Sequence, residues 1–263
     1  MEKIVVCIKG VPRPGTVKVD PVTHTLRREG AELMLNPHDR PALEMAMRLK
    51  NRYGVPVVVL SMGPPNVVPL LKEAYALGAD EMILLSDRAF AGADTLATSR
   101  VLAKALERLS PFSLVLMGLK SIDGETAQVP PETAALLGIP SVINVREIAF
   151  EEDKVLLIRG TDYGEEELEV SPPLIVSVTT KMDYLRPPSF KRILESRELS
   201  PKVFTASDLG LSEEHLGLKG SPTQVAGLFE RVREAKGEIW EGDPEELAGR
   251  LIELLKERGF IKS

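Results

Sequence analysis

The chain begins with a continuous apolar run, Ile4-Val5-Val6-Cys7-Ile8, which is rich in β-branched residues and too short for a stable helix. A run of this kind predicts a strand that is buried on both faces of a parallel sheet. Further apolar runs follow at residues 55–61, 81–85 and 114–117, with helical periodicity between them. This alternation predicts an α/β domain with parallel strands joined by right-handed crossovers.

Helix signals separate these strands. Asn36 and Pro37 predict the start of the first helix, because an asparagine side chain can accept hydrogen bonds from first-turn amides and proline suits the first helical position. Gly78 is expected just after the end of the second helix, and Asp94 is expected to cap the third. These later helices are predicted at residues 67–77, 95–109 and 132–137.

Residues 10–33 form a long polar connection after the first strand. Connections of this length are uncommon in compact domains, so the segment is expected to be functional or partly ordered as a hairpin.

The pattern changes after residue 140. Acidic turns separate three strands, which predict an antiparallel extension of the sheet, and an apolar strand then follows at residues 174–179. The three strands of the extension are predicted at residues 142–150, 154–160 and 165–170.

Two regions are expected, an α/β domain at residues 1–180 and a second region at 181–263. The second region has few apolar runs and ends in an amphipathic helix at residues 244–258, with Asp243 as its cap. A segment with so little core of its own is expected to be an arm that packs on another subunit.

Composition excludes several classes of protein. The chain has 33 Lys and Arg against 39 Asp and Glu, and this net charge of −6 argues against a general nucleic-acid binder. Cys7 is the only cysteine, which excludes an internal disulfide and a cysteine-built zinc site. No apolar run approaches the ~18 residues of a membrane span. We therefore expect a soluble, cytoplasmic protein without membrane insertion.

In an open α/β sheet, ligands bind beyond the carboxyl ends of the strands. The loop at residues 118–133 is the most informative of these places, because it combines Gly124, the hydroxyls of Thr126 and Thr133, and the amide of Gln128 with a helix N-terminus. Backbone amides at such a place bind phosphate well. An ordinary polar loop before a helix is the alternative interpretation.

Signals for catalysis are weak. No GxGxxG, P-loop or GxSxG motif is present, and Lys9-Gly10-Val11-Pro12 follows the first strand instead. Cys7 is expected to be a packed apolar group rather than a nucleophile. The residues alone therefore predict a nucleotide-binding α/β protein with an interaction arm.

At the same loops the sequence resembles the β subunit of electron transfer flavoprotein, over essentially its whole length. The segments that carry this resemblance are Val6-Cys7-Ile8-Lys9, Leu35-Asn36-Pro37 with Ala42-Leu43-Glu44-Met45-Ala46, Ser61-Met62-Gly63-Pro64, Ala76-Leu77-Gly78-Ala79-Asp80, residues 87–95, residues 121–133 and the closing helix at 248–261. Each segment is modest alone, but their order and spacing are specific.

The resemblance implies an adenine nucleotide alpha hydrolase-like domain in a heterodimer whose α subunit holds most of the FAD. Such a complex is an electron carrier without bond-making catalysis. It takes electrons from flavin dehydrogenases of the acyl-CoA dehydrogenase type and passes them to a quinone oxidoreductase. The β subunit binds AMP, and the corresponding residues here are Cys7, Asn36, Pro37, His38, Asp39, Met62, Asp123, Gly124, Glu125, Thr126, Ala127, Gln128, Val129, Thr133 and Ala134.

The family also has a partner-recognition loop, which matches residues 186–195 here. The resemblance implies contacts from Arg186, Ser189, Phe190 and Ile193, with Phe190 at the apolar anchor position where the family often has leucine.

Three alternatives remain open. Bifurcating members of the family bind a second FAD in place of AMP. A stand-alone adenine-nucleotide sensor would form a homodimer without a partner. An adenine-nucleotide hydrolase or ligase would need a glycine-serine phosphate loop after the first strand, which this sequence does not supply.

Overall fold

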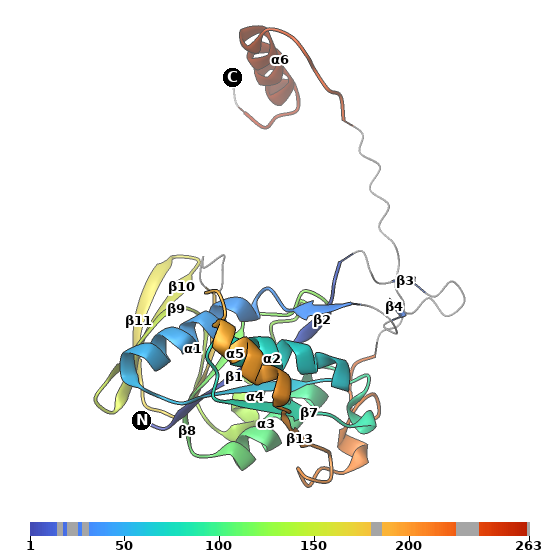
Figure 1. The fold of residues 1–263 in the computed structure, drawn as a ribbon. Coiled ribbons are helices and arrows are strands. Elements are labelled where there is room, and N and C mark those ends of the chain that lie inside the picture. Colours follow the sequence, from blue (N-terminus) through green and yellow to red (C-terminus); the bar gives the residue numbers. More distant parts are fainter. Residues whose placement is uncertain (15–17, 20–25, 28–31, 180–185, 225–236, 262–263) are drawn as a thin grey trace. The chain divides into compact units, whose positions relative to one another are not determined.

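A mostly parallel sheet forms the centre of the molecule (Figure 1). The computed structural model describes residues 1–14, 18–19, 26–27, 32–179, 186–224 and 237–261. Within them, nine strands hydrogen-bond in the order β11-β10-β9-β12-β8-β1-β6-β7-β13. The parallel strands are β1 (Lys3–Ile8), β6 (Val57–Met62), β7 (Glu81–Leu85), β8 (Phe112–Gly118), β12 (Leu174–Val178) and β13 (Lys202–Phe204).

An antiparallel meander extends one side of this sheet, as predicted. Its strands are β9 (Ser141–Glu151), β10 (Lys154–Thr161) and β11 (Gly164–Val170). β9 also pairs with β12 in parallel, which joins the meander to the parallel strands. The predicted α/β fold class is therefore confirmed.

Helices cover both faces of the sheet (Figure 1). α1 (Asp39–Tyr53) and α2 (Val68–Leu77) pack on one face, where buried side chains such as Leu43 meet Ile4. α3 (Thr95–Leu109) and α4 (Val129–Leu137) pack on the other, where Val101 meets Val5. Short helical turns, η1 (Pro65–Val67), η2 (Arg88–Phe90) and η3 (Glu213–His215), complete the connections.

From β6 to β12, successive parallel strands are added to the sheet first on one side of β1 and then on the other. β6 and then β7 lie on one side of β1, whereas β8 and then β12 lie on the other. The carboxyl ends of β1 and β8 are therefore a topological switch point, the place where open α/β sheets bind ligands.

The predicted caps are right at some helices and wrong at the first. Asp94 accepts a hydrogen bond from the Ala97 amide at 3.0 Å, and Gly78 ends α2 with a φ of 137°, as expected. Asn36 does not cap α1, which begins only at Asp39, because the Asn36 side chain bonds residues far away in the sequence. Pro37 accordingly lies before the helix, and α4 begins three residues earlier than predicted.

The long connection after β1 is partly ordered as a hairpin, which confirms one of the two expectations for it. β2 (Gly10–Pro12) pairs with β5 (Leu33–Leu35), and β3 (Lys18–Val19) pairs with β4 (Leu26–Arg27).

The first compact unit comprises Met1–Gly227. α5 (Phe190–Glu198) packs on α2, where the Arg192 Nε atom donates to the Tyr75 carbonyl at 2.8 Å. β13 then adds to β7 as an edge strand. The sequence did not predict β13, because it has three residues and only Phe204 among them is buried.

The second compact unit, Leu228–Ser263, contains α6 (Pro244–Glu257). Asp243 accepts hydrogen bonds from the Glu245 and Glu246 amides, which confirms the predicted cap. No residue of α6 is buried, and Leu251 and Ile252 are about half exposed. Among the described helices, none is long and apolar enough to cross a membrane.

Candidate functional site

Lys9, which follows β1, contacts the loop that follows β8. Its Nζ atom lies 2.8 Å and 3.0 Å from the two carboxylate oxygens of Asp123 and 3.3 Å from the Ser121 hydroxyl. Burial acts to raise the pKa of Asp123, but the hydrogen bond and charge of Lys9 outweigh it and hold this pKa below its ordinary value. The two loops at the switch point are thus joined by an ion pair.

A second connection between these loops runs through Asn36 and Asp39. The Asn36 Nδ2 atom donates to Asp39 Oδ1 at 2.8 Å and to the Lys120 carbonyl at 2.9 Å, and its Oδ1 accepts from the Ile122 amide at 3.3 Å. Asp39 Oδ2 accepts from the Lys9 amide at 2.7 Å. Asn36 is 1 % exposed and Asp39 is 5 % exposed, so this network is buried.

Burial also changes the acidity of two groups here. It raises the pKa of Asp39 to about 7, although hydrogen bonds from Lys9 and Asn36 act in the opposite direction. Burial, and secondarily the nearby Asp39 carboxylate, raises the pKa of the Cys7 thiol far above its usual range. Cys7 therefore stays a neutral, packed thiol, which agrees with the expectation that it is not a nucleophile.

Gly118, the last residue of β8, allows the start of α1 to approach the sheet. A Cβ atom at this position would lie 2.3 Å from Asp39 Oδ1 and 2.5 Å from the His38 carbonyl oxygen. Only glycine leaves room for this contact.

The loop backbone between β8 and α4 has a conformation suited to an anion. Glu125 and Ala127 have positive φ values of 53° and 56°. Within the described residues, the amides of Gly124, Thr126, Ala127 and Gln128 have no protein hydrogen-bond partner. Left-handed residues in such a turn direct successive N–H groups into an anion-binding concavity. The Glu125 carboxylate is offset by Lys120 Nζ at 3.4 Å.

The start of α4 is held by α3. The Thr95 hydroxyl lies 3.2 Å from both Gln128 Oε1 and Glu132 Oε1 and can donate its hydrogen to one of them, and the Ser99 hydroxyl donates to Glu132 Oε2 at 3.1 Å. Sequence reasoning missed these contacts, because nothing in a single sequence pairs α3 with α4. The Gln128 side chain does not cap α4.

The other predicted site residues differ in their placement. Thr133 is fully buried and donates its hydroxyl to the Val129 carbonyl at 2.7 Å, and Ala134 lies in the core. Met62 ends β6 beside β1, Pro37 is exposed, and His38 is half-buried. Contacts therefore join Asn36, Asp39 and Asp123, whereas Thr133 and Ala134 face the core. Four residues that complete this edge were not among the predicted nucleotide contacts: Lys9, Gly118, Lys120 and Ser121.

Comparison with known proteins shows the family to which the chain belongs. The electron transfer flavoprotein domain model matches residues 23–209. The electron transfer flavoprotein subunit beta of Thermoanaerobacterium thermosaccharolyticum is 43% identical over 259 residues, covering 98% of this chain and 99% of that protein. The chain belongs to the electron transfer flavoprotein β-subunit family. Members of this family are electron-carrier subunits rather than catalytic enzymes.

Other relatives belong to named systems. The caffeyl-CoA reductase-Etf complex subunit CarD of Acetobacterium woodii is 41% identical over 261 residues, covering 98% of this chain and 100% of that protein. Protein FixA of Bradyrhizobium diazoefficiens is 36% identical over 233 residues, covering 86% of this chain and 81% of that protein. As a β subunit of this family, the chain is one part of a flavoprotein complex with an α partner.

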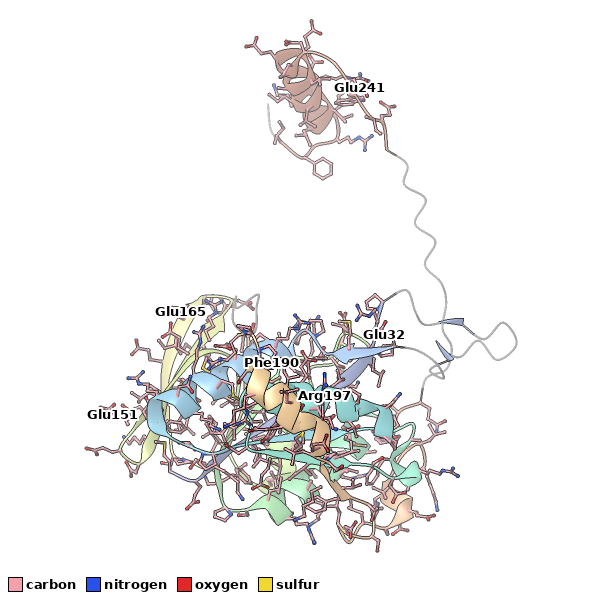
Figure 2. All side chains as sticks on the ribbon, in the orientation of Figure 1. Glu32, Glu151, Glu165, Phe190, Arg197 and Glu241 are labelled. Carbon is pink, nitrogen blue, oxygen red and sulfur yellow. The ribbon has the colours of Figure 1, made fainter. Side chains whose placement is uncertain are left out.

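The segment predicted to be a partner-recognition loop, residues 186–195, presents apolar side chains on α5. Phe190 is 74 % exposed and Leu194 is 43 % exposed, and Figure 2 shows Phe190 at one end of α5 and Arg197 towards the other. Arg186 is instead engaged within the domain, since its Nε and Nη2 atoms lie 3.0 Å and 2.8 Å from the two carboxylate oxygens of Glu44. The Ser189 amide donates to the Ala76 carbonyl at 3.2 Å, and Ile193 is half-buried.

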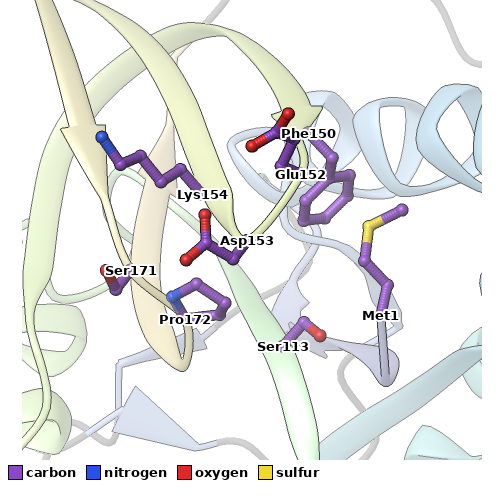
Figure 3. A pocket seen from close by; sticks show the side chains of 8 residues that line it. All are labelled: Met1, Ser113, Phe150, Glu152, Asp153, Lys154, Ser171 and Pro172. Atoms are coloured by element: carbon purple, nitrogen blue, oxygen red, sulfur yellow. The ribbon is translucent and has the colours of Figure 1, made fainter.

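An open hollow lies at the opposite edge of the sheet, near the amino ends of β1, β8 and β12 (Figure 3). Its lining residues are Met1, Ser113, Phe150, Glu152, Asp153, Lys154, Ser171 and Pro172. None of the predicted site residues lies there. In the part of the chain that the structure describes, no group of three or more His, Cys, Asp or Glu side chains could hold a metal ion.

Proposed function

We propose that this chain is the β subunit of a heterodimeric electron transfer flavoprotein that accepts electrons from flavin dehydrogenases of the acyl-CoA type and passes them to a quinone oxidoreductase. The α subunit holds most of the FAD, and this chain encloses that FAD on one side. The complex works in the cytoplasm. Near full-length similarity to a subunit of a caffeyl-CoA reductase-Etf complex supports a partner enzyme that acts on CoA thioesters.

The switch-point edge binds an adenylate, and AMP is the expected ligand. The observation that carries this proposal is the loop at residues 124–128, with its positive φ values and its amides without protein partners in the described structure. These amides hold the phosphate, while residues 36–39 and Met62 form the neighbouring wall. Lys9 and Lys120 offset the loop's carboxylates, which reduces their repulsion of a phosphate. AMP supplies no redox chemistry and stabilises the folded chain by mass action.

Nucleotide analysis of the complex tests this proposal. The chain is co-expressed with its α subunit and purified, the complex is denatured, and the released nucleotides are identified and counted by mass spectrometry. One FAD and one AMP are expected for each heterodimer. Two FAD molecules would instead indicate the bifurcating type, because the adenylate half of FAD offers the same phosphate to these amides. Release of no adenylate beyond a single FAD would contradict nucleotide binding by this chain.

The oligomeric state tests the subunit role. The exposed apolar side chains of α6 support an arm at residues 237–261 that packs on the α subunit. Deleting residues 237–263 should prevent co-purification of the α subunit while the rest of the chain stays folded. A monodisperse homodimer that ignores the α subunit would favour a stand-alone nucleotide sensor.

α5 forms the contact with the dehydrogenase, with Phe190 as its apolar anchor. The aromatic side chain is exposed in the described structure, and buried aromatic anchors carry much of the energy of interfaces. Phe190→Ala should slow electron transfer from the dehydrogenase about tenfold, which corresponds to ~1.4 kcal/mol, without changing flavin content. Tyr163→Ala is the matched control, because Tyr163 is fully exposed in the turn between β10 and β11, away from α5. Equal effects of the two variants, or loss of flavin from Phe190→Ala, would contradict this role.

A further inference from the structure

The Asn36 and Asp39 side chains are occupied by contacts within the protein. Both hydrogens of the Asn36 amide are donated, to Asp39 Oδ1 and to the Lys120 carbonyl, and its oxygen accepts from the Ile122 amide. The two carboxylate oxygens of Asp39 accept hydrogen bonds from Asn36 and from the Lys9 amide, and the Gly118 amide acts on the same carboxylate. Both residues are at least 95 % buried. These side chains therefore have little capacity left for a ligand.

We propose that Asn36 and Asp39 are positioning residues, which fix residues 120–122 to the end of β1 and thereby hold the amides of residues 124–128 in place for the nucleotide. This inference rests on the proposed adenylate site. It replaces the expectation that the two side chains contact the ligand themselves.

The bonds form one continuous chain between two strands. It runs from the Lys9 amide through Asp39 and Asn36 to Lys120 and Ile122, over distances of 2.7, 2.8, 2.9 and 3.3 Å. The Asn36 side chain bonds a carbonyl and an amide that lie two residues apart, as a neighbouring strand would. Loss of either side chain therefore removes one of the connections between β1 and the start of the loop, while the Lys9–Asp123 ion pair remains.

The surroundings of Asp39 favour this role over a general contribution to stability. Gly118 accommodates the carboxylate against the end of β8, and the charge of Lys9, with hydrogen bonds from Lys9, Asn36 and Gly118, acts to lower its pKa against the effect of burial. A charge that is buried without a cation in contact costs free energy. The presence of the Asp39 carboxylate beside the start of the loop is explained if its hydrogen bonds are needed to position residues 120–122.

Asp39→Asn and Asn36→Ala test the proposal in the complex with the α subunit. Asp80→Asn is the matched control, because Asp80 Oδ2 also accepts a strand amide, that of Val57 at 2.8 Å, but at the opposite edge of the sheet. The measurements are the affinity of the nucleotide-depleted complex for AMP, the exchange rates of the amides of residues 120–128, and the free energy of unfolding.

Asp39→Asn and Asn36→Ala should each weaken AMP binding about tenfold and accelerate exchange in residues 120–128, whereas Asp80→Asn should change neither. Because the two residues act in one chain, the double variant should weaken AMP binding no more than the stronger single variant.

Equal loss of AMP affinity in Asp39→Asn and Asp80→Asn would overturn the proposal, since it would reduce the effect to general stability. Unchanged exchange in both site variants would also overturn it, and this measurement needs no ligand. If the wild-type complex binds no adenylate, the proposed nucleotide site fails, while the exchange rates still decide whether these residues position the loop. If Asn36→Ala does not fold, the isosteric Asp39→Asn alone decides the outcome.

Discussion

Asp80 and Asp39 each accept a hydrogen bond from a backbone amide, at opposite ends of the parallel strands. We call the side of the sheet where these strands begin the amino edge, and the side where they end the carboxyl edge. Asp80 accepts the Val57 amide at 2.8 Å and bonds the Lys50 ammonium group at 2.6 Å, where its side chain is 39 % exposed. Asp39 accepts the Lys9 amide at 2.7 Å, but its second partner is the neutral amide of Asn36, and it is buried. Within the described residues, Asp80 therefore has a cation in contact and is partly exposed to solvent, whereas Asp39 is buried and has no cation in contact.

This difference in burial and in partners suggests different roles: the Asp80 contact holds two segments together, whereas the Asp39 contact positions a loop. At the amino edge, a lysine offsets the charge, so the contact joins strands at little desolvation cost. At the carboxyl edge, the charge is desolvated and the contact directs a loop whose amides are unpaired. Local costs of this kind are expected where a protein binds its ligands.

Glycine substitutions should give the largest effect. Gly118→Ala should lower the free energy of unfolding by about 3 kcal/mol, because the new methyl group would overlap Asp39 and the His38 carbonyl. Gly54→Ala, before β6 at the amino edge, should cost only ~1 kcal/mol, because its φ of 69° disfavours a side chain but no atom lies within 4 Å. Urea denaturation measures both, and equal losses would contradict the difference between the edges.

The second-largest effect should be a pH dependence of stability that comes from Asp39. Its pKa is raised from 3.8 to about 7 in the folded chain, so between these values the folded chain binds the proton and the unfolded chain does not. Stability therefore falls as the pH rises through this window. Relative to Asp39→Asn, the wild type should lose on the order of 2 kcal/mol between pH 5 and pH 8. If the free energy of unfolding of the wild type, relative to Asp39→Asn, stayed constant or increased from pH 5 to pH 8, the predicted direction of the pH dependence would be wrong.

Arg186→Ala should lower the free energy of unfolding by less than Gly118→Ala and by less than the pH-dependent loss at Asp39. Burial acts to raise the pKa of Glu44, but hydrogen bonds from Arg186 and Arg48 outweigh it and lower this pKa below 4.5. The pair therefore stabilises the fold above this pH and loses its contribution as the pH falls below it. The variant should lose about 1.5 kcal/mol at pH 7 in urea denaturation. Lys191→Ala, which removes an exposed cation 3.8 Å from Glu195, should be neutral.

Lys50→Met should have the smallest effect, at the amino edge. It removes the ion pair with Asp80 and a hydrogen bond to the Gly78 carbonyl, both near the surface. The expected loss is about 0.5 kcal/mol, and part of it should disappear in 1 M salt, where exposed charges are screened. A loss as large as that of Gly118→Ala would mean that the amino edge is not the more tolerant one.

The sequence predicted the elements whose signals are local. Buried parallel strands such as β1 read as continuous apolar runs, and Asp94 and Asp243 cap helices through amides only two or three residues away. The carboxyl-edge loop was also predictable, since the order of strands and helices determines where strand ends meet.

The remainder depends on contacts between distant residues. Asn36 was read as a cap, but it bonds Lys120 and Ile122, which lie more than 80 positions away in the chain. β13 carries too short a pattern to be recognised without its partner β7. The choice between ligand contact and positioning at Asp39 likewise required its hydrogen-bond partners, because an aspartate in a sequence carries no record of what it bonds.

β13 also sets an order of events during translation. The β7 edge of the sheet stays open until residues 202–204 have left the ribosome, because β13 is the strand that pairs there. Leu228–Ser263 follows β13 in the chain and therefore leaves the ribosome later. The apolar side chains of α6 thus leave the ribosome after the strand that pairs with β7. The unpaired backbone of β7 and the apolar face of α6 are therefore exposed one after the other.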